Sequence, residues 1–386
     1  MQQNYLKSQP KKILHFITSL NVGGAENMLK KLINNDPRIQ NEVIVLAPLN
    51  SSIITDNFLA KIHPLDLSIT WKSLIRSPLT MYRIFKITRT FRPEVIVGWM
   101  YHAIPLAFIT AKFFSKPIVF NIRQTLYDLK NEKTTTRLVI RLVSFLTKWT
   151  NSIIYNSDVS KIQHEKFGYN KKPSILIGNG FELELMTSQL TEFRSKIRKI
   201  HEIEENELAM AVIARFHPMK GHEFFLKSIK KFLQNSNEKI PLKIILAGNQ
   251  MNLENIHLTQ IIKELGLESH VQLIGLISNS AEILPAIDLL VSPSLWGEGF
   301  SNVIGEAIAA NVLTISSNIG EASKLLDEQF IFEAGDVDGF LNRLKYFTKL
   351  SSTEKEFHQK KHLENFKKLY SIQEIANQYY ALYRQL

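Results

Sequence analysis

Short apolar runs alternate with helical patterns along almost the whole chain, and this rhythm occurs twice. The runs suited to strands cover residues 12–18, 42–47, 94–100, 117–122, 152–156 and 174–178, and then 208–215, 242–248, 271–275, 289–292, 313–316 and 330–333. Strands that alternate with helices are typical of parallel sheets covered by helices. The sequence therefore predicts two similar, Rossmann-like α/β halves, joined near residues 178–187.

Helical patterns fill most of the gaps in the first half. They cover residues 25–34, 72–91, 103–114, 134–150 and 159–167. The last segment, residues 351–386, reads as two helices with no strand after them. With 386 residues, the chain is long for a single core and suits two domains of ordinary size.

Composition narrows the class of protein. There is no cysteine, so disulfides and thiolate-bound metals are excluded. The first residues lack the apolar core of a signal peptide. The longest apolar run, residues 103–114, is interrupted by Pro105 and Lys112 and is shorter than the ~18 residues of a spanning helix. We therefore expect a cytoplasmic protein that is soluble or peripheral on a membrane.

The positive charge lies in the N-terminal half. Up to Leu185 there are 25 Lys and Arg against 12 Asp and Glu, and after it 22 against 24. A basic face indicates nucleic acid or anionic lipid as a partner. No aromatic-basic RNA-binding pattern, zinc finger or helix-turn-helix accompanies it. We therefore expect an anionic membrane surface, at the cytoplasmic face, and no nucleic acid.

Two glutamates frame a glycine-aromatic turn in the stretch SLWGEGFSNVIGEAIAAN, residues 294–311. Glu298 precedes the turn. An apolar-periodic helix is predicted to begin near Ser301 or Asn302, which places Glu306 about one turn inside it. A loop carboxylate and a helix carboxylate are therefore expected to face one cleft.

The start of that helix is also expected to bind anions. Unpaired amides and a partial positive charge at a helix N-terminus suit a phosphate, here from Gly299, Phe300 and Ser301, with Asn302 beside them. The two carboxylates accept hydrogen bonds from hydroxyl groups. A nucleotide-sugar carries both kinds of group.

The same stretch resembles the E-x7-E signature of glycosyltransferase family 4, the group 1 glycosyl transferases, which are retaining enzymes of the GT-B fold. The resemblance implies that Glu298 lies by the donor sugar and Glu306 by the ribose. Many relatives have proline where Ser301 stands, and we expect this departure to be tolerated. Nearly the whole chain follows the family pattern, with the further motifs in order.

The first predicted strand is followed by Asn-Val-Gly-Gly-Ala-Glu at the start of a helix. Paired glycines allow close approach of a ligand, although Gly23 and Gly24 by themselves also suit an ordinary turn. They resemble the family's GGAE loop, which lies over the donor phosphates and the acceptor site. His102, at the end of the strand 94–100, matches a family histidine that meets the donor sugar, and we expect it to make a contact without transferring a proton.

The strand 208–214 leads into Arg-Phe-His-Pro-Met-Lys-Gly and a helix. Such cations are commonly just solvated, but the spacing of Arg215 and Lys220 resembles the family's diphosphate clamp. It implies that the two side chains stabilise the departing nucleoside diphosphate, as a divalent metal does elsewhere. No Asp-x-Asp motif stands at a strand end, so we expect no metal and no cofactor in the chemistry.

Several weaker features complete the pattern. Ile274 ends a predicted strand where the family holds the nucleotide base through backbone groups. Asn179-Gly180 suits a hinge turn without a catalytic role. Arg123 suits either an acceptor phosphate or a solvated basic loop. The cationic helix 72–92 suits packing on its own sheet or contact with an anionic membrane.

The resemblance implies two domains facing across a deep cleft, with the C-terminal helix crossing back to the first. We expect an acceptor-binding domain at residues 1–183, a donor-binding domain at 184–365, and the crossing helix at 366–386. The expected catalytic residues are Glu298, His102, Arg215 and Lys220. No second carboxylate nucleophile is evident, which disfavours a double displacement. Domain closure is expected to exclude water.

The expected activity is transfer of a hexose or N-acetylhexosamine from a nucleotide-sugar, with retention of the anomeric configuration. A UDP-sugar is expected as the donor ahead of a GDP-sugar. The expected acceptor is a hydroxyl of a glycan, lipid-linked, in surface polysaccharide or lipopolysaccharide synthesis. Two alternatives stay open. A GT-B sugar-nucleotide epimerase would release epimerised donor without acceptor, and a non-catalytic binder would hold nucleotide-sugar without turning it over.

Overall fold

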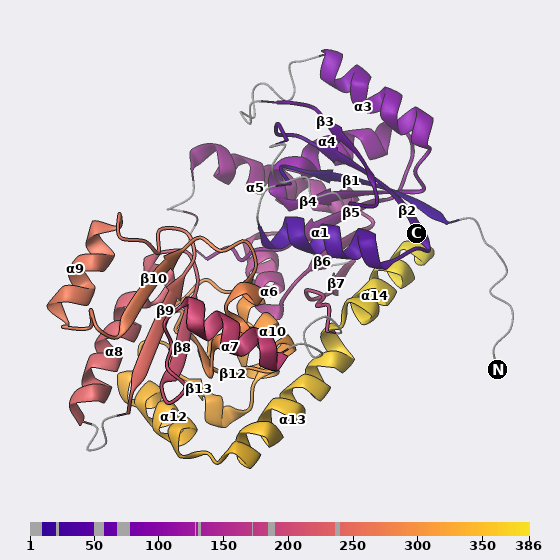
Figure 1. The fold of residues 1–386 in the computed structure, drawn as a ribbon. Helices are drawn as coiled ribbons and strands as arrows, with labels where there is room; N and C mark the ends of the chain where they lie inside the picture. Colours follow the sequence, from indigo (N-terminus) through magenta and orange to yellow (C-terminus); the bar gives the residue numbers. More distant parts are fainter. Residues whose placement is uncertain are drawn as a thin grey trace, which may run out of the picture. The chain divides into compact units, whose positions relative to one another are not determined.

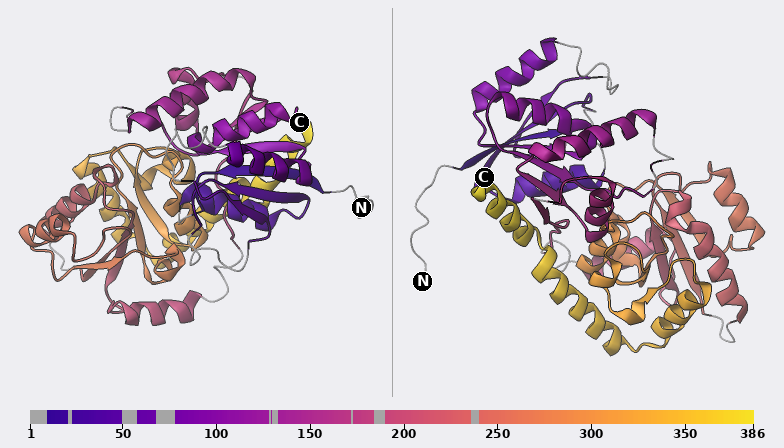
Figure 2. Two further views of the ribbon diagram at one scale, coloured as in Figure 1. Left: turned by 90° about the horizontal axis from the view of Figure 1, so that it is seen from above. Right: turned by 180° about the vertical axis from the view of Figure 1, so that it is seen from behind.

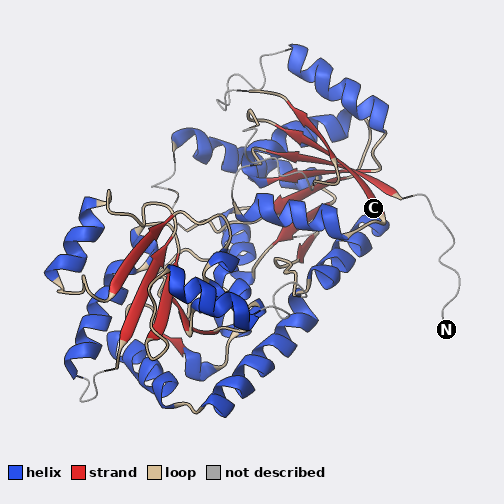
Figure 3. Ribbon diagram, viewed as in Figure 1, coloured by secondary structure: helices blue, strands red, loops and turns tan. Residues whose placement is uncertain are grey.

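The structure is a computed structural model of the chain. It describes residues 10–20, 23–49, 58–67, 78–127, 129, 133–171, 173–183, 190–235 and 240–386. The chain divides into two compact units, one of Met1–Gly180 with Ile372–Leu386 and the other of Phe181–Ser371. In Figure 1 the first unit runs from indigo to magenta and includes the yellow C-terminal helix, and the second unit runs from rose through orange to gold. Each unit is a sheet with helices around it, which is the expected α/β class (Figure 3).

The first unit has a seven-stranded sheet with the order β3-β2-β1-β4-β5-β6-β7, in which neighbouring strands pair in parallel. Its strands are β1 (Lys11–Ile17), β2 (Ile39–Val45), β3 (Lys61–Pro64), β4 (Val95–Trp99), β5 (Ile118–Ile122), β6 (Ser152–Tyr155) and β7 (Ser174–Leu176). Its helices are α1 (Gly24–Asn35), α3 (Pro78–Phe91), α4 (Met100–Phe113), α5 (Thr134–Leu146), η1 (Thr147–Trp149), α6 (Asp158–Phe167) and α14 (Ile372–Gln385).

Different helices pack on the two faces of this sheet. Right-handed crossovers place α1 on one face and α3, α4 and α5 on the other. Leu14 and Phe16 of β1 belong to the core under α3, α4 and α5, together with Phe120 of β5. The alternate β1 residue His15 contacts Trp99, whose ring stacks on Tyr379 of α14. Helix α14 therefore lies with α1, as the expected return of the C-terminal helix requires (Figure 2).

The second unit has a six-stranded sheet with the order β10-β9-β8-β11-β12-β13, also paired in parallel. Its strands are β8 (Leu208–Ile213), β9 (Leu242–Ala247), β10 (Val271–Gly275), β11 (Leu289–Ser292), β12 (Leu313–Ser317) and β13 (Ile331–Phe332). Its helices are α7 (Leu190–Ile200), η2 (Pro218–Lys220), α8 (His222–Asn235), α9 (Ile256–Glu264), η3 (Ser280–Glu282), η4 (Leu284–Ala286), α10 (Asn302–Ala309), α11 (Ala322–Leu325), η5 (Glu328–Phe330), α12 (Val337–Lys349) and α13 (Ser352–Tyr370).

The observed elements differ from the sequence prediction at a few points. Strand β3 was not predicted, because four residues carry too little periodicity. The predicted helix 72–91 is described from Pro78 onward, and its earlier residues lie outside the described part. The predicted helix 134–150 ends as an α-helix at Leu146 and continues as η1. Of the helices in the described ranges, none is long and apolar enough to cross a membrane.

Candidate functional site

The strand order of the second unit reverses between β8 and β11, which are neighbours although they are far apart in sequence. In open parallel sheets, ligands bind beyond the carboxyl ends of the strands at such a switch point. The loop after β8 carries Arg215 and Lys220, and the loop after β11 carries Glu298. The topology therefore brings the expected phosphate and sugar residues of this unit to one end of the sheet.

The carboxylate of Glu298 has two partners within this unit. The Nζ of Lys220 contacts its Oε1, and the Oγ of Ser294 donates to the same oxygen at 2.7 Å. The side chains of Glu298 and Lys220 are only 11% and 20% exposed. Because this shielding lowers the local dielectric, the pair holds both charged groups in defined positions.

Backbone contacts fix the two loops against each other. Leu295 N donates to Met219 O at 2.7 Å. Gly221 adopts a left-handed φ of +68°, and a Cβ there would lie 2.0 Å from Pro293 O. Gly297 is similarly close to the sulfur of Met219. Glycine is thus required where the Lys220 loop passes the Glu298 loop.

A third loop, after β12, supports Glu298 from the other side. Gly320 has φ +67°, and a Cβ there would lie 2.3 Å from Gly299 O. The amide of Glu321 donates to the same carbonyl at 3.1 Å. These contacts hold the Gly299 peptide, so the turn that follows Glu298 is fixed by main-chain bonds.

Helix α10 begins at Asn302, as predicted, and Glu306 lies one turn inside it. Ser301 is the N-cap residue, but its side chain does not cap the helix. The first-turn amides are therefore not satisfied by that hydroxyl, which suits an anion at this end. Phe300 is buried against Phe181 and Tyr370, so its side chain belongs to the core and only its backbone can serve a ligand.

Arg215 and Ile274 also lie at the carboxyl end of this sheet. The guanidinium of Arg215 is exposed and makes no hydrogen bond or ion pair with the described residues. Ile274 lies in β10, where a bulge separates Leu273 from Gly275 and leaves Leu276 exposed. A group held by the backbone of residues 274–276 would therefore lie at the edge of the sheet.

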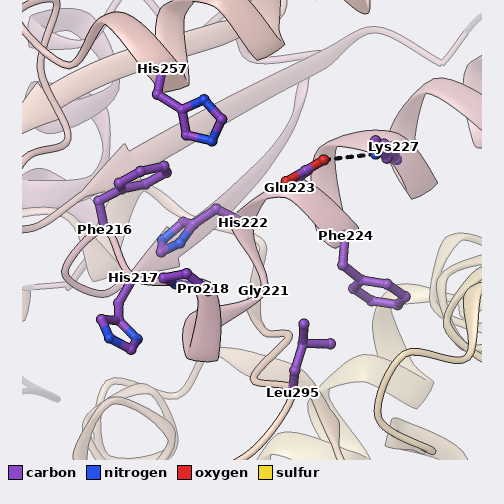
Figure 4. Close-up of a pocket in the computed structure, with 10 residues that line it drawn as sticks. All are labelled: Phe216, His217, Pro218, Gly221, His222, Glu223, Phe224, Lys227, His257 and Leu295. Carbon is purple, nitrogen blue, oxygen red and sulfur yellow. Dashed lines mark hydrogen bonds and ion pairs between the residues drawn. The ribbon is translucent and has the colours of Figure 1, made fainter. Parts of the chain in front are cut away.

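A pocket of about 340 Å³ opens beside the Lys220 loop (Figure 4). The Phe216 ring lies between His222 and His257, with centroids 5.7 and 5.9 Å away. His222 is 2% exposed, and neither ring nitrogen has a partner among the described residues. Burial, with the nearby charge of Lys220, lowers the pKa of His222 to about 4. His222 is therefore neutral at pH 7, and its ring packs against Phe216 of the Lys220 loop.

The first unit has its own switch point, between β1 and β4. Gly23 and Gly24 follow β1, and Glu26 in the first turn of α1 accepts a hydrogen bond from Ser19 Oγ at 3.1 Å. The prediction that His102 ends a strand is wrong. Strand β4 ends at Trp99, and His102 lies in the first turn of α4, because the chain turns at Met100 with φ +63°.

Arg123 is buried in the first unit, at the carboxyl end of β5. Its guanidinium donates to Tyr379 OH and to Gly178 O, both at 2.9 Å, and contacts Asn179 Oδ1. It is 9% exposed. This differs from both sequence interpretations, a solvated loop and an acceptor phosphate, because the two terminal nitrogens of the guanidinium are already bound to protein oxygens. Arg123 instead ties α14 to the segment that leaves the unit.

Sequence reasoning missed three residues of the second unit that shape the site. Ser294 bonds Glu298, His222 packs the Lys220 loop, and Gly320 fixes the Gly299 peptide. Ser294 lies in the stretch 294–311, but a serine in a sequence gives no signal of which side chain it will bond. Across the described ranges, no three His, Cys, Asp or Glu side chains are grouped so that they could hold a metal ion.

Two family models match the chain. "Glycosyl transferases group 1" covers residues 193–363, and "Glycosyltransferase Family 4" covers residues 22–185. Among characterised proteins, the chain is 25% identical over 278 residues, 70% of each chain, to the UDP-Gal:alpha-D-GlcNAc-diphosphoundecaprenol alpha-1,3-galactosyltransferase of Escherichia coli. It is 24% identical over 195 residues to the N-acetyl-alpha-D-glucosaminyl L-malate synthase of Bacillus anthracis, which covers 49% of this chain and 48% of that protein.

Solved structures share the fold. Anabaena Alr3699/HepE, in complex with UDP and glucose, superposes with a TM-score of 0.80 at 20% identity, covering 97% of this chain and 100% of that one. A glycosyltransferase from Rickettsia africae ESF-5 superposes with a TM-score of 0.81 at 15% identity, covering 98% and 99%. These likenesses confirm the expected GT-B fold.

Proposed function

The chain belongs to the group 1 glycosyl transferases and is a glycosyltransferase, and on this premise we propose that it transfers a hexose or N-acetylhexosamine from a nucleotide-sugar to a hydroxyl of a glycan. The observation that carries the proposal is the Lys220–Glu298 pair at the switch point of the second unit, beside the start of α10. A cation, a carboxylate and the start of a helix that the Ser301 side chain does not cap together suit phosphates and a sugar.

The roles follow from the placement of the groups. Arg215 and Lys220 bind the diphosphate, with the α10 amides as further donors. Glu298 accepts hydrogen bonds from sugar hydroxyls and offsets positive charge at the anomeric carbon, while Glu306 binds the ribose. The exposed Arg215 guanidinium needs no rearrangement to bind phosphate, whereas Lys220 must exchange Glu298 for it. Gly23 and Gly24 are proposed to lie over the donor phosphates and the acceptor site, and His102 is proposed to contact the donor sugar.

We propose retention as the stereochemical outcome. The acceptor oxygen forms its bond to the anomeric carbon on the face from which the phosphate oxygen departs. The pair of electrons of the breaking bond leaves with the nucleoside diphosphate, whose terminal phosphate takes the acceptor's proton. The cations of Arg215 and Lys220 stabilise that leaving group, so the proposed chemistry requires no metal.

The donor is proposed to be a UDP-sugar. The E. coli relative is named for UDP-Gal, and the Anabaena structure holds UDP and glucose. The E. coli relative's acceptor is a sugar linked to diphosphoundecaprenol. By analogy, the acceptor of this chain is a lipid-linked glycan at the cytoplasmic membrane face, in surface polysaccharide or lipopolysaccharide synthesis.

The first experiment is a thermal-shift panel of UDP, GDP, ADP and CMP with their common sugar conjugates, with and without EDTA. Stabilisation by uridine ligands, unchanged by EDTA, supports the donor and the metal-free clamp. Glu306→Gln should weaken the UDP response through its lost ribose contact. Stabilisation by another base would overturn the donor assignment, and a response abolished by EDTA would overturn the clamp.

A turnover assay separates transfer from its alternatives. The chain is incubated with the stabilising donor, with and without a lipid-linked glycan, and the products are analysed by mass spectrometry and NMR. Acceptor-dependent transfer with an unchanged anomeric configuration is expected. Release of an epimerised donor without acceptor would identify an epimerase instead, and binding with no turnover under any condition would identify a binder.

A further inference from the structure

Both side-chain donors to Glu298 use the same carboxylate oxygen. The Nζ of Lys220 and the Oγ of Ser294 each bond Oε1, and no described residue bonds Oε2. A carboxylate oxygen accepts about two hydrogen bonds, so these two donors fill Oε1. Oε2 is therefore the oxygen that is left for a hydroxyl of a sugar.

Only one of the two donors is expected to stay on Glu298 when a nucleotide-sugar binds. In the proposed mechanism, Lys220 exchanges Glu298 for the diphosphate. Ser294 is 3% exposed, and its short side chain reaches only groups beside its own backbone, so it stays with the carboxylate. The orientation of Glu298 toward the sugar then depends on Ser294.

The backbone of Ser294 is itself held by the neighbouring strand. Strands β11 and β12 pair as far as Ser292 and Ser316, and Pro293 has no N–H group with which to continue the ladder. The next β12 residue, Ser317, is 1% exposed and donates through its Oγ to Ser294 O at 2.5 Å. A side-chain bond thus joins the two chain segments beyond the point where their backbone ladder ends.

We propose that Ser294 is a positioning residue, which keeps Glu298 in its catalytic orientation after Lys220 has moved to the diphosphate. Ser317 acts in turn through Ser294. The inference rests on the proposed function, because it assigns Oε2 of Glu298 to a hydroxyl of the donor sugar. Hydrogen bonds to charged groups are stronger than those between neutral groups, and a misplaced catalytic group lowers the rate steeply. Loss of the Ser294 hydroxyl should therefore affect the sugar and its transfer but not the nucleotide.

A purely structural role for Ser294 is the competing explanation. Buried hydroxyl groups need hydrogen-bond partners, and in this explanation Glu298 serves only as that partner. Ser316 provides a matched comparison, because it is 2% exposed and lies at the same strand end. Its Oγ donates to Ser292 O at 3.4 Å and to Ser317 O at 3.0 Å. Ser316→Ala therefore removes a buried hydroxyl without removing a bond to the Glu298 carboxylate.

Binding and turnover, measured on the full chain, test the proposal. Calorimetry compares UDP with UDP-glucose, UDP-galactose and their N-acetylamino counterparts, and a transfer assay with a lipid-linked glycan gives kcat and KM. Ser294→Ala should bind UDP as the unaltered chain does, because Arg215 and Lys220 are unchanged. Its kcat should fall by about 10- to 100-fold, the range for a hydrogen bond to a charged group, and its preference for a UDP-sugar over UDP should fall as well. Ser317→Ala should show the same pattern more weakly, and Ser316→Ala should show none of it.

A double variant separates positioning from structure. If Ser294 acts only through the charged carboxylate, Ser294→Ala should cost little further transfer in a chain that already carries Glu298→Gln. A structural role predicts the same loss in both backgrounds, and that result would overturn the proposal. Ser294→Cys has a weaker donor of similar size, so its kcat should lie between those of the unaltered chain and Ser294→Ala.

The possible outcomes keep this inference distinct from the proposed function. If the unaltered chain transfers sugar and Ser294→Ala transfers it equally fast, the positioning role is wrong and the proposed function stands. If Ser294→Ala weakens UDP and the UDP-sugars equally, the residue supports the site as a whole, and the positioning role is again wrong. If the unaltered chain turns over no UDP-sugar, both fail, and this result needs no variant to be seen.

Discussion

Lys220 and Glu298 form an ion pair between the loops that follow β8 and β11, with Ser294 Oγ bonded to the same carboxylate oxygen. The two residues are expected to serve different parts of the donor, one the phosphate and the other the sugar. Within the second unit each side chain holds the other in place. The pair therefore fixes the two loops relative to each other, and we expect donor binding to separate it.

Glu298→Gln should separate binding from turnover. The amide removes the charge that competes for Lys220, so UDP should bind at least as tightly as to the unaltered chain. Transfer should fall by about 10²–10³-fold, because the charge opposite the anomeric carbon is lost. Calorimetry with UDP and a transfer assay measure the two effects. Lys220→Met is the matched control and should weaken UDP binding, whereas weaker UDP binding by Glu298→Gln would contradict the proposed competition.

Gly221→Ala should disrupt the crossing of the two loops. Its left-handed φ costs any L-residue about 1 kcal/mol, and its Cβ would also collide with Pro293 O. Gly266 has a similar φ of +63°, but a Cβ there would meet only the end of the Lys230 side chain at 3.6 Å. Gly266→Ala is therefore the control for backbone strain alone. Thermal unfolding should show a larger drop in melting temperature for Gly221→Ala than for Gly266→Ala. Stabilisation by UDP should weaken only in Gly221→Ala.

Arg123→Met should destabilise the first unit. The change leaves the Asn179 side chain, the Gly178 carbonyl and Tyr379 OH without a buried charged donor, at a cost of about 3 kcal/mol or more. Hydrogen exchange of the β5 and α14 amides reports this unit separately. Arg89→Met, at an exposed position of α3, should change protection little. Equal protection in both variants would show that the Arg123 bonds are not stabilising.

Acidification should destabilise the chain through His222. Its folded pKa is about 4, below the value of about 6.5 in the unfolded chain, so the unfolded state binds the proton first. The contribution to stability is therefore complete above pH 6.5 and is lost as the pH falls toward 4. By pH 4 the loss from this residue alone should approach about 3 kcal/mol.

Urea unfolding at pH 7.5 and pH 5 tests this expectation with His222→Leu. The leucine cannot be protonated, and it replaces ring nitrogens that have no partners, so the variant should lose less stability between the two pH values. His257→Leu removes an exposed imidazole from the same pocket and is the control. The His222 explanation fails if the two variants show the same pH dependence.

Much of the site was accessible from the sequence because its signals are local. The helix start near Ser301, the position of Glu306 inside α10 and the loop with Arg215 and Lys220 all follow from short-range periodicity and turn residues. His102 was misplaced for the same reason, since the apolar run through β4 continues into α4 without a change in composition. Only the backbone turn at Met100 separates strand from helix.

The sequence by itself determined the two α/β halves and the order of their loops, because apolar periodicity reports the local element and its buried face. The tertiary structure decided which distant groups meet. Tyr379, 256 residues beyond Arg123 in sequence, makes that arginine a buried tie, and the strand order that joins β8 to β11 brings Lys220 to Glu298. These pairings depend on sheet order and crossover direction, and local patterns do not encode either.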